Sequence, residues 1–519
     1  MIKQIKTNNK IDYKVLCWGG GICLLFVLWA IIWPEKASST FNLWLAFFTT
    51  KFGWLYLLIV SGFVIFLIWL CCSKYGSIVL GKDGEKPEYS TLSWFFMLFA
   101  AGMGIGLVFW SVAEPMSHYL TPPSGEGRTI ESAELAMRYS FMHWGLHPWA
   151  CFGIVGLPLA YFQFRKNKPA LLSSCLIPLI GEKRADGALG SLVNILAVFA
   201  TVFGVATSLG LGAMQIGSGI SYVFGISYNN AMLVLIIITV TLLFIISSVS
   251  GINRGIRLLS NFNMAVAAIL LTFVLILGPT LFLTNFFTST LGNYLQNIIS
   301  VSFWTDPFNT NSGWLGSWTI FYWAWWISWG PFVGGFIARI SRGRTIRQFV
   351  IATLICPVIL SFIYMSIMGG TAIYMDMQGS DTVAQAMEEN VSYALFALLE
   401  TFPGAAAISL LAIILISTFF ITSADSSTFV CAMMTSHGVQ TPPKFLRVFW
   451  GTAESLVAIV LLLAGGLTSL QTASIVGAFP FMIICIFILI AFIMALQKDE
   501  YIVAKEKQKA AFMSRESIK

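Results

Sequence analysis

Aromatic residues provide the clearest candidate for a ligand-binding site in this sequence. Six of its 18 tryptophans lie between Trp314 and Trp329, in the stretch WLGSWTIFYWAWWISW. A quaternary ammonium ion has no N–H group to donate, but the negative faces of aromatic rings attract it, by about 0.5–2 kcal/mol per ring. The stretch therefore indicates a site for such a cation.

An aromatic belt at the membrane interface is the other interpretation of these tryptophans. On a helix, Trp314 and Trp329 would lie roughly 22 Å apart along the axis, too far for one headgroup layer. Trp325 and Trp326 differ by about 100° in direction, so both can line one cavity wall. Trp318, Tyr322, Trp325 and Trp329 share one helix face. A ligand site is therefore favoured over a belt.

A glycine run is the second informative stretch. Gly102, Gly104 and Gly106 alternate within an apolar segment, and each costs a helix about 1 kcal/mol relative to Ala. Alternate residues do not share a helix face, so close packing explains them poorly. An unwound segment would free carbonyl groups for a cation and present amides to a carboxylate. Glu114, which follows, is interpreted as a solvated residue near the membrane surface rather than a gate.

Histidine and hydroxyl side chains offer weaker signals. His143 and His147 have an i, i+4 spacing that could bind a metal, but no third ligand is evident, so structural roles are favoured. The adjacent Thr422 and Ser423 form a plausible hydroxyl pair for an alkali cation. Asp425, just beyond them, is interpreted as a solvated residue at a helix end.

These residues must be positioned by membrane-spanning helices. The chain of 519 residues is 57% hydrophobic and 10% charged, which is typical of a polytopic all-α membrane protein. Twelve spans are predicted near 15–33, 53–72, 91–112, 140–163, 189–211, 230–249, 262–283, 316–337, 349–371, 401–422, 449–466 and 473–496. Of the 30 basic residues, 26 fall in alternate loops, which predicts that both termini are cytoplasmic. The net charge of +7 reflects this asymmetry rather than nucleic-acid binding.

The spacing of the spans predicts an inverted repeat. The third and eighth spans both contain helix-weakening glycines, with Gly330-Pro331 and Gly334-Gly335 in the eighth, and they are five spans apart. An odd offset places them in opposite directions, which is typical of secondary transporters. The predicted units are a cytoplasmic N-terminus (1–14), two peripheral helices (15–90), a first five-helix repeat (91–284), an external amphipathic helix (285–303), a second repeat (315–497) and a cytoplasmic tail (498–519).

Several motifs together resemble the betaine/choline/carnitine transporter family over nearly the whole chain. They are GMGIG (102–106), AEP (113–115), HWGLHPW (143–149), FYWAWWISW (321–329), ARISRGRTIR (338–347) and TSADS (422–426). The chain is most similar to sodium-coupled glycine betaine transporters of Gram-positive bacteria. The resemblance implies a fold like that of the amino-acid/sodium symporters (LeuT-like) and a homotrimer.

The resemblance also implies the binding residues. Substrate contacts are expected from Trp144, Trp149, Phe152, Trp326, Trp325, Trp329, Phe321, Gly102, Gly104 and Gly106. One sodium ion is expected at Ala100, Met103, Phe419, Thr422 and Ser423. A second is expected at Thr201 and Phe332, but Val205 stands where relatives have a Thr. Phe152 keeps a ring face but lacks the hydroxyl of the Tyr found in some relatives.

We therefore predict a sodium symporter rather than an enzyme, located in a bacterial cell membrane and importing glycine betaine or a related trimethylammonium osmoprotectant. No cofactor is expected besides the coupling ion, and the basic tail could contact anionic lipid. Proton-coupled choline carriers tend to have Asp in place of Gly106, and carnitine antiporters an intramembrane Arg; this chain has neither. Choline or carnitine transport, by symport or by exchange, is the alternative. A cation channel would need a polar pore ring that these spans lack.

Overall fold

The computed structural model describes residues 11–102, 104–250, 253–308, 313–502 and 504. Apart from one isolated bridge between Val79 and Thr345, the elements of these residues are helical. The predicted all-α class is therefore confirmed.

The helices fall into three groups by length. The long ones, of 20 residues or more, are α1 (Tyr13–Ile32), α2 (Pro34–Cys72), α10 (Ala188–Phe224), α11 (Asn230–Ser250), α12 (Asn253–Leu277), α13 (Thr280–Ser302), α14 (Phe321–Ile340), α15 (Ile346–Met377), α18 (Ala405–Met434) and α19 (Lys444–Gln497). Those of intermediate length are α3 (Thr91–Gly102), α4 (Ile105–Leu120), α5 (Ile130–Trp144) and α6 (Leu146–Ala160). Short helices occupy the loops: α7 (Leu172–Cys175), α8 (Ile177–Ile180), α9 (Glu182–Ala185), α16 (Thr382–Glu389) and α17 (Ala394–Glu400).

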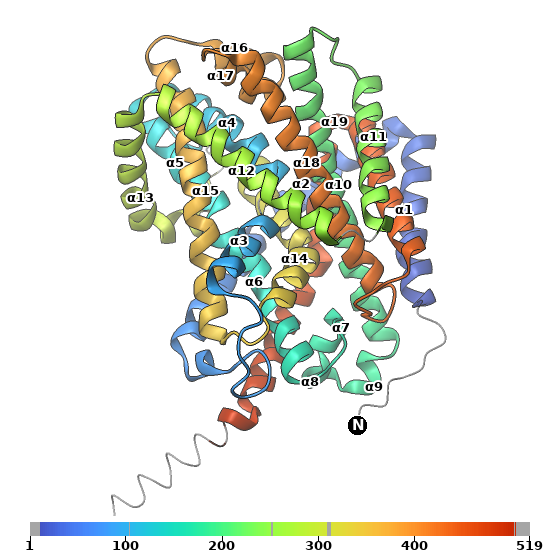
Figure 1. Ribbon diagram of the computed structural model, residues 1–519. Helices are drawn as coiled ribbons and strands as arrows, with labels where there is room; N and C mark the ends of the chain where they lie inside the picture. The colour runs from blue at the N-terminus through green and yellow to red at the C-terminus, as the bar shows by residue number, and fades with distance from the viewer. Residues whose placement is uncertain (1–10, 103, 251–252, 309–312, 503, 505–519) are drawn as a thin grey trace, which may run out of the picture.

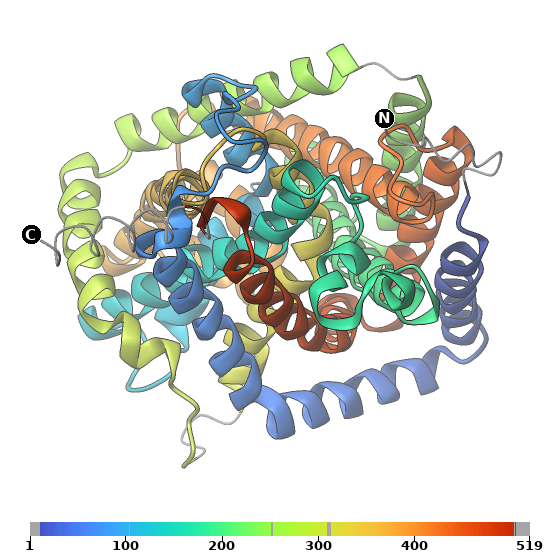
Figure 2. The ribbon, with the colours of Figure 1, turned by 90° about the horizontal axis from the view of Figure 1, so that it is seen from below.

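The long helices run side by side in one bundle, with α12 lying obliquely across its outside (Figure 1). Figure 2 shows α1, the first part of α2, α12 and α13 around the perimeter of the bundle. Burial agrees with this arrangement. In an apolar stretch of 18 residues, 94% of the residues are buried in α5–α6, but only 28% in α12. The segment α5–α6 therefore lies at the centre, where side chains face protein on all sides.

Among the described residues, nine helices are long and apolar enough to cross a membrane. One of them, α19, has non-helical backbone angles at Gly465 and Gly466, so it consists of two helices joined by a kink. This kink falls on the last two residues of the predicted eleventh span (449–466), shortly before the twelfth (473–496). The chain is thus a multi-pass membrane protein.

The predicted break in the third span is present, because α3 ends at Gly102 and α4 begins at Ile105. Met103, between them, lies outside the described residues. A second break, which the sequence analysis did not predict, separates α5 from α6 at Gly145. The predicted interruption of the eighth span at Gly330-Pro331 is wrong, because α14 is continuous from Phe321 to Ile340.

Two glycines of α14, Gly330 and Gly334, serve close packing instead. A Cβ atom at Gly334 would lie 2.9 Å from the backbone nitrogen of Gly156 in α6, and one at Gly156 would lie 2.9 Å from the Gly334 carbonyl. A Cβ atom at Gly330 would lie 3.2 Å from Val155. Small residues let two membrane helices approach in this way. The glycines therefore fix the α6–α14 contact on which the site described below is built.

The loops that follow α2 and α14 bind each other at one end of the bundle. Backbone hydrogen bonds join Leu80 to both Gly343 and Arg344. The buried guanidinium of Arg344 lies 4.5 Å from the centre of the Trp94 ring, and Arg342 pairs with Glu85 at 2.6 Å. The basic run ARISRGRTIR is thus partly engaged within the protein.

Asp499, just beyond α19, holds a buried ionic cluster at the same end. Its two carboxylate oxygens accept hydrogen bonds from Arg165 at 2.7 and 2.8 Å and from the Tyr161 hydroxyl at 2.7 Å. Burial would raise the pKa of Asp499, but the bonds from Arg165 and Tyr161 outweigh it and lower this pKa from 3.8 to about 2. Because the folded pKa is the lower one, this stabilisation is complete above about pH 4 and is lost as the pH falls toward 2.

We expect Asp499→Asn to lower the stability of the protein by about 3 kcal/mol at neutral pH, because it leaves Arg165 without its buried charged partner. The thermal unfolding midpoint in detergent measures this effect. The control is Glu182→Gln, which removes an exposed bond to Lys168 and should change the midpoint little. Equal midpoints for the two variants would contradict the assigned role of Asp499.

Candidate functional site

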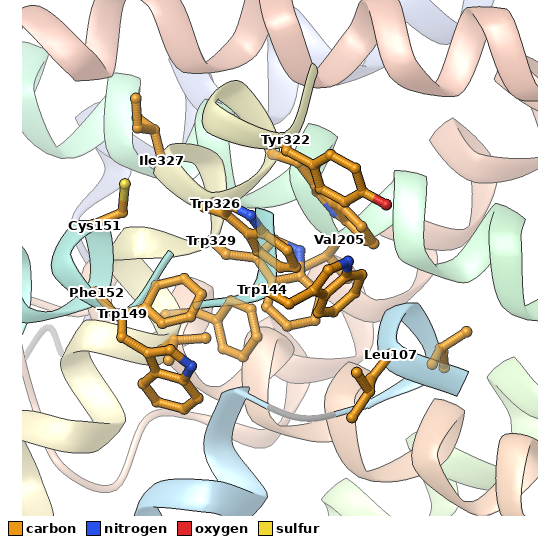
Figure 3. Close-up of a cluster of buried hydrophobic side chains, with 14 of the residues drawn as sticks. Leu107, Trp144, Trp149, Cys151, Phe152, Val205, Tyr322, Trp326, Ile327 and Trp329 are labelled. Atoms are coloured by element: carbon orange, nitrogen blue, oxygen red, sulfur yellow. The ribbon is translucent and has the colours of Figure 1, made fainter. Parts of the chain in front are cut away.

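Aromatic rings from three helices meet in one cluster at the centre of the bundle. Trp144 lies at the end of α5, Trp149 and Phe152 lie in α6, and Trp326 lies in α14; each side chain is at most 2% exposed. The ring centres of Trp326 lie 4.9 Å from Trp144 and 6.1 Å from Phe152, and Phe152 lies 5.5 Å from Trp149. All three pairs are close to perpendicular. Figure 3 shows these rings gathered beside α4, from which Leu107 points toward them.

The break at Gly145 positions the rings contributed by α5 and α6. Trp144 is the last residue of α5 and Trp149 follows in the first turns of α6. A Cβ atom at Gly145 would lie 2.3 Å from the carbonyl oxygen of Phe141, so the break has no room for another residue type. The indole N–H of Trp326 donates to the His143 carbonyl at 3.0 Å, which holds α14 against this break.

The glycine run lies directly against the rings. A Cβ atom at Gly102 would lie 2.5 Å from the Trp149 ring, and one at Gly106 would lie 2.5 Å from Trp325 and 3.2 Å from Trp144. Contacts of 2.5 Å are too short for real atoms, so only glycine lets the broken α3–α4 segment approach this closely. The structure thus brings together the two stretches that the sequence singled out, although more than 200 residues separate Gly106 from Trp325.

A second set of rings continues along α14. Phe321 stacks on Trp325 with ring centres 5.5 Å apart, and Trp325 lies 5.8 Å from Trp329. The indole N–H groups of Trp325 and Trp329 both donate to the carbonyl of Gly204 in α10, at 3.3 and 3.1 Å. All three side chains are buried. The predicted inner aromatic positions therefore form one row that α10 holds in place.

Glu114 is not the solvated residue that the sequence analysis expected, because its side chain is fully buried in α4. Its Oε2 accepts hydrogen bonds from Trp144 Nε1 at 2.7 Å and from the Tyr322 hydroxyl at 2.5 Å. Its Oε1 is 2.7 Å from His143 Nδ1 and 3.3 Å from His118 Nε2. The prediction failed because the four partners come together from three helices: His118 from α4 itself, His143 and Trp144 from α5, and Tyr322 from α14. Together they supply the polar contacts that water would otherwise provide.

His118 and His143 belong to this network, whereas His147 has other partners. His143 Nε2 contacts Thr319 Oγ1 at 2.9 Å, while His147 stacks on Trp323 and contacts Ser302 Oγ at 3.0 Å. Ligand atoms of Glu114, His118 and His143 lie within 4.8 Å of one another. The hydrogen bonds account for this arrangement without a metal. The predicted structural role therefore fits His143 and His147 better than the i, i+4 metal site.

The hydroxyl pair expected to bind sodium lies in the middle of α18. A Cβ atom at Gly104 would lie 3.1 Å from Ser423 Oγ, so Ser423 faces the α3–α4 break. Thr422 Oγ1 lies 3.1 Å from the carbonyls of Thr418 and Phe419. Met103 lies outside the described residues, and of Ala100 only the backbone of α3 is described.

Thr201 and Phe332, expected at a second sodium site, and Asp425 lie in different parts of the bundle core. Thr201 donates to the Ala197 carbonyl of its own helix at 2.8 Å, and Phe332 packs 5.1 Å from Trp329. Asp425 is buried rather than solvated, because α18 continues to Met434, and Ser247 Oγ lies 3.5 Å from its carboxylate. The predicted helix end at Asp425 is therefore wrong.

Three residues of the site were not identified as such from the sequence: the Tyr322 hydroxyl, the Gly204 carbonyl and Glu114. For Glu114 a signal existed, because an acidic residue within an apolar span is by default a candidate functional residue. Its i, i+4 spacing from His118 pointed the same way. No sequence pattern marks the Gly204 carbonyl, because its role as a hydrogen-bond acceptor depends only on which helix packs against α10.

Comparisons with known proteins agree with the geometry. Residues 14–501 match the family described as BCCT, betaine/carnitine/choline family transporter. The chain is 48% identical to the probable glycine betaine transporter of Desulfitobacterium hafniense, covering 95% of this chain and 99% of the relative. It is 48% identical to the glycine betaine transporter OpuD of Bacillus subtilis, covering 93% and 94%. It is 43% identical to the ectoine/hydroxyectoine transporter of Virgibacillus pantothenticus, covering 96% and 99%.

Proposed function

Since this chain belongs to the betaine/carnitine/choline transporter family, we propose that it imports glycine betaine together with sodium. The observation that carries the proposal is the contact between the broken α3–α4 segment and the aromatic cluster, where Gly102 and Gly106 meet the rings of Trp149 and Trp325. Glycine betaine is a zwitterion, so its two ends need different partners. The rings suit its trimethylammonium end, and the amides at the start of α4 suit its carboxylate.

Sodium coupling is supported by the position of Ser423 opposite Gly104. Hard cations prefer oxygen ligands, and a helix break exposes carbonyl oxygens that a regular helix uses internally. Phe419, Thr422 and Ser423 on α18, with Ala100 and Met103 on the other side, would supply such oxygens. A second sodium at Thr201 and Phe332 would lack the hydroxyl that Val205 replaces.

The membrane arrangement that we propose has twelve spans with both termini in the cytoplasm of a bacterium. The nine described helices of membrane-spanning length, which count α5–α6 as one segment and do not include α13, account for most of them. The broken α3–α4 and α14 with the preceding turn Gly316–Ile320 add two, and the kink divides α19. Residues 91–284 and 315–497 would form inverted repeats, and rocking of one helix bundle against the other would alternate access. A homotrimer and a contact between the basic tail and anionic lipid complete this proposal.

Other substrates are distinguished by their charges. Choline has the trimethylammonium group but no carboxylate, carnitine has both on a longer chain, and ectoine, the substrate named for one relative, carries its positive charge on a ring with N–H groups. The rings of the cluster offer faces but no hydrogen-bond acceptor, and the nearby Glu114 carboxylate is already bound by Trp144 and Tyr322. This arrangement favours a cation without N–H groups.

Uptake of radiolabelled glycine betaine by a transport-deficient bacterial host expressing the full chain tests the proposal. We expect saturable uptake that stops when sodium is replaced by potassium. Unlabelled choline, carnitine and ectoine are then added as competitors, and each should compete more weakly than betaine. Uptake that persists without sodium would overturn the coupling, and stronger competition by ectoine or choline would overturn the substrate.

We expect Thr422→Ala to raise the sodium concentration for half-maximal uptake at least tenfold, about 1.4 kcal/mol of lost binding. The reason is that this hydroxyl belongs to the proposed ion site. Thr418→Ala is the matched control, one helical turn earlier, with a hydroxyl that contacts carbonyls of its own helix. The sodium dependence of uptake should be unchanged in that variant, and equal shifts in both would exclude a specific role for Thr422.

A further inference from the structure

The buried carboxylate of Glu114 is connected to two rings of the aromatic cluster. It accepts hydrogen bonds from the indole N–H of Trp144 and from the hydroxyl of Tyr322. The Tyr322 ring packs against the cluster, with its centre 5.7 Å from Trp144 and 5.9 Å from Trp326. Glu114 thus contacts the edge of one ring of the proposed binding surface and the edge of a second ring that packs against that surface.

The hydrogen-bond partners of Glu114 identify it as an ionised carboxylate. Its Oε2 accepts from the Trp144 indole N–H, which can only donate, and from the Tyr322 hydroxyl. His118 Nδ1 has no partner within the described residues, so His118 is neutral and its proton lies on Nε2, facing Oε1. His143 Nδ1–H donates to Oε1, whether its Nε2 accepts from Thr319 or donates to it. A carboxylate without a proton satisfies all four donors, so its negative charge lies at the edges of the Trp144 and Tyr322 rings.

A negative acceptor at the edge of an aromatic ring changes what its face binds. The N–H and O–H dipoles are polarised toward the carboxylate, which increases electron density in the rings. A cation over the faces is held by this density and by the charge behind it, and both effects are strong where water is excluded. A neutral group of the same shape gains from neither.

We propose that Glu114 is a specificity-determining residue that makes the aromatic cluster select a positively charged headgroup over a neutral group of equal shape. This inference rests on the proposed function and goes beyond it by assigning charge selection to a residue that need not touch the substrate. Shape selection remains with the rings and with the glycine run.

The test compares two ligands that differ in one atom. Glycine betaine and 3,3-dimethylbutanoate have the same shape, but a neutral carbon replaces the charged nitrogen in the latter. Dissociation constants for both are measured by calorimetry with the purified full chain in sodium buffer. Failure of the wild-type protein to bind betaine would contradict the proposed function and is thereby distinguished from failure of this inference.

In Glu114→Gln we expect betaine affinity to fall at least tenfold, while affinity for 3,3-dimethylbutanoate changes less than threefold. Glu114→Asp keeps the charge, so the ratio of the two affinities should remain that of the wild type. Glu454→Gln is the matched control: this carboxyl is also fully buried and contacts Ser427, Thr428 and Cys431, and the ratio should not change.

Trp144→Phe tests the hydrogen bond between Trp144 and Glu114 from the donor side, because it keeps a ring face but removes the N–H group. Its preference for betaine over 3,3-dimethylbutanoate should decrease, although less than in Glu114→Gln. An equal loss of both ligands in Glu114→Gln, or an unchanged ratio in both variants, would show that Glu114 is only structural and would overturn the inference. If Glu114→Gln does not fold, Trp144→Phe decides alone.

Discussion

Replacing Trp326 by leucine should weaken betaine binding by about 30-fold or more while the protein remains folded. Trp326 is the ring that connects the others, since it contacts both Trp144 and Phe152. Its loss removes a cation–π contact and the bond to the His143 carbonyl. Together these should cost about 2–4 kcal/mol, which weakens binding by about 30-fold or more. The dissociation constant and the thermal unfolding midpoint of the purified variant measure the two parts of this prediction.

Two variants serve as controls for this prediction. Trp326→Phe keeps a ring face without the indole N–H, so betaine affinity should be intermediate. Trp18→Leu removes a tryptophan that is 68% exposed on α1 and should leave binding unchanged. Unchanged betaine affinity in Trp326→Leu would refute the aromatic site, whatever the other variants show.

The second large effect is expected from Gly106→Ala, a change of one methyl group. The new Cβ atom would lie 2.5 Å from the Trp325 ring and 3.2 Å from Trp144, so either the rings or α4 must move. Overpacking of this kind costs about 1–3 kcal/mol. Because the strain falls on the rings of the site, we expect the initial rate of betaine uptake at low concentration to fall about 5- to 150-fold.

Gly335→Ala is the matched control on α14. A Cβ atom at Gly335 would meet no atom within 4 Å, and Ala favours the helix over Gly by about 1 kcal/mol. Uptake and thermal midpoint should therefore equal or exceed those of the wild type. If Gly106→Ala transports as well as Gly335→Ala, the close approach between the glycine run and the rings has no functional role.

The sequence by itself determined the features that depend on local composition and spacing. Apolar runs of span length predict helices wherever they occur, because each backbone group in a membrane must be bonded within its own segment. The glycine run predicts a break in the third span because alternate glycines weaken a helix without forming a packing face. Trp314 and Trp329 would lie too far apart along a helix for one headgroup layer, so their spacing placed some of these rings at membrane depth.

Only the tertiary structure decided the features that depend on the opposing surface. The glycines of α14 and those between α3 and α4 are the same residue type, but Gly334 fits against Gly156 and leaves α14 continuous, whereas α3 ends at Gly102. Glu114 is buried because Tyr322, 208 residues away, and His143, 29 residues away, supply its donors. Whether a buried charge is tolerated depends on its partners, and partners so distant in sequence become neighbours only when the helices pack.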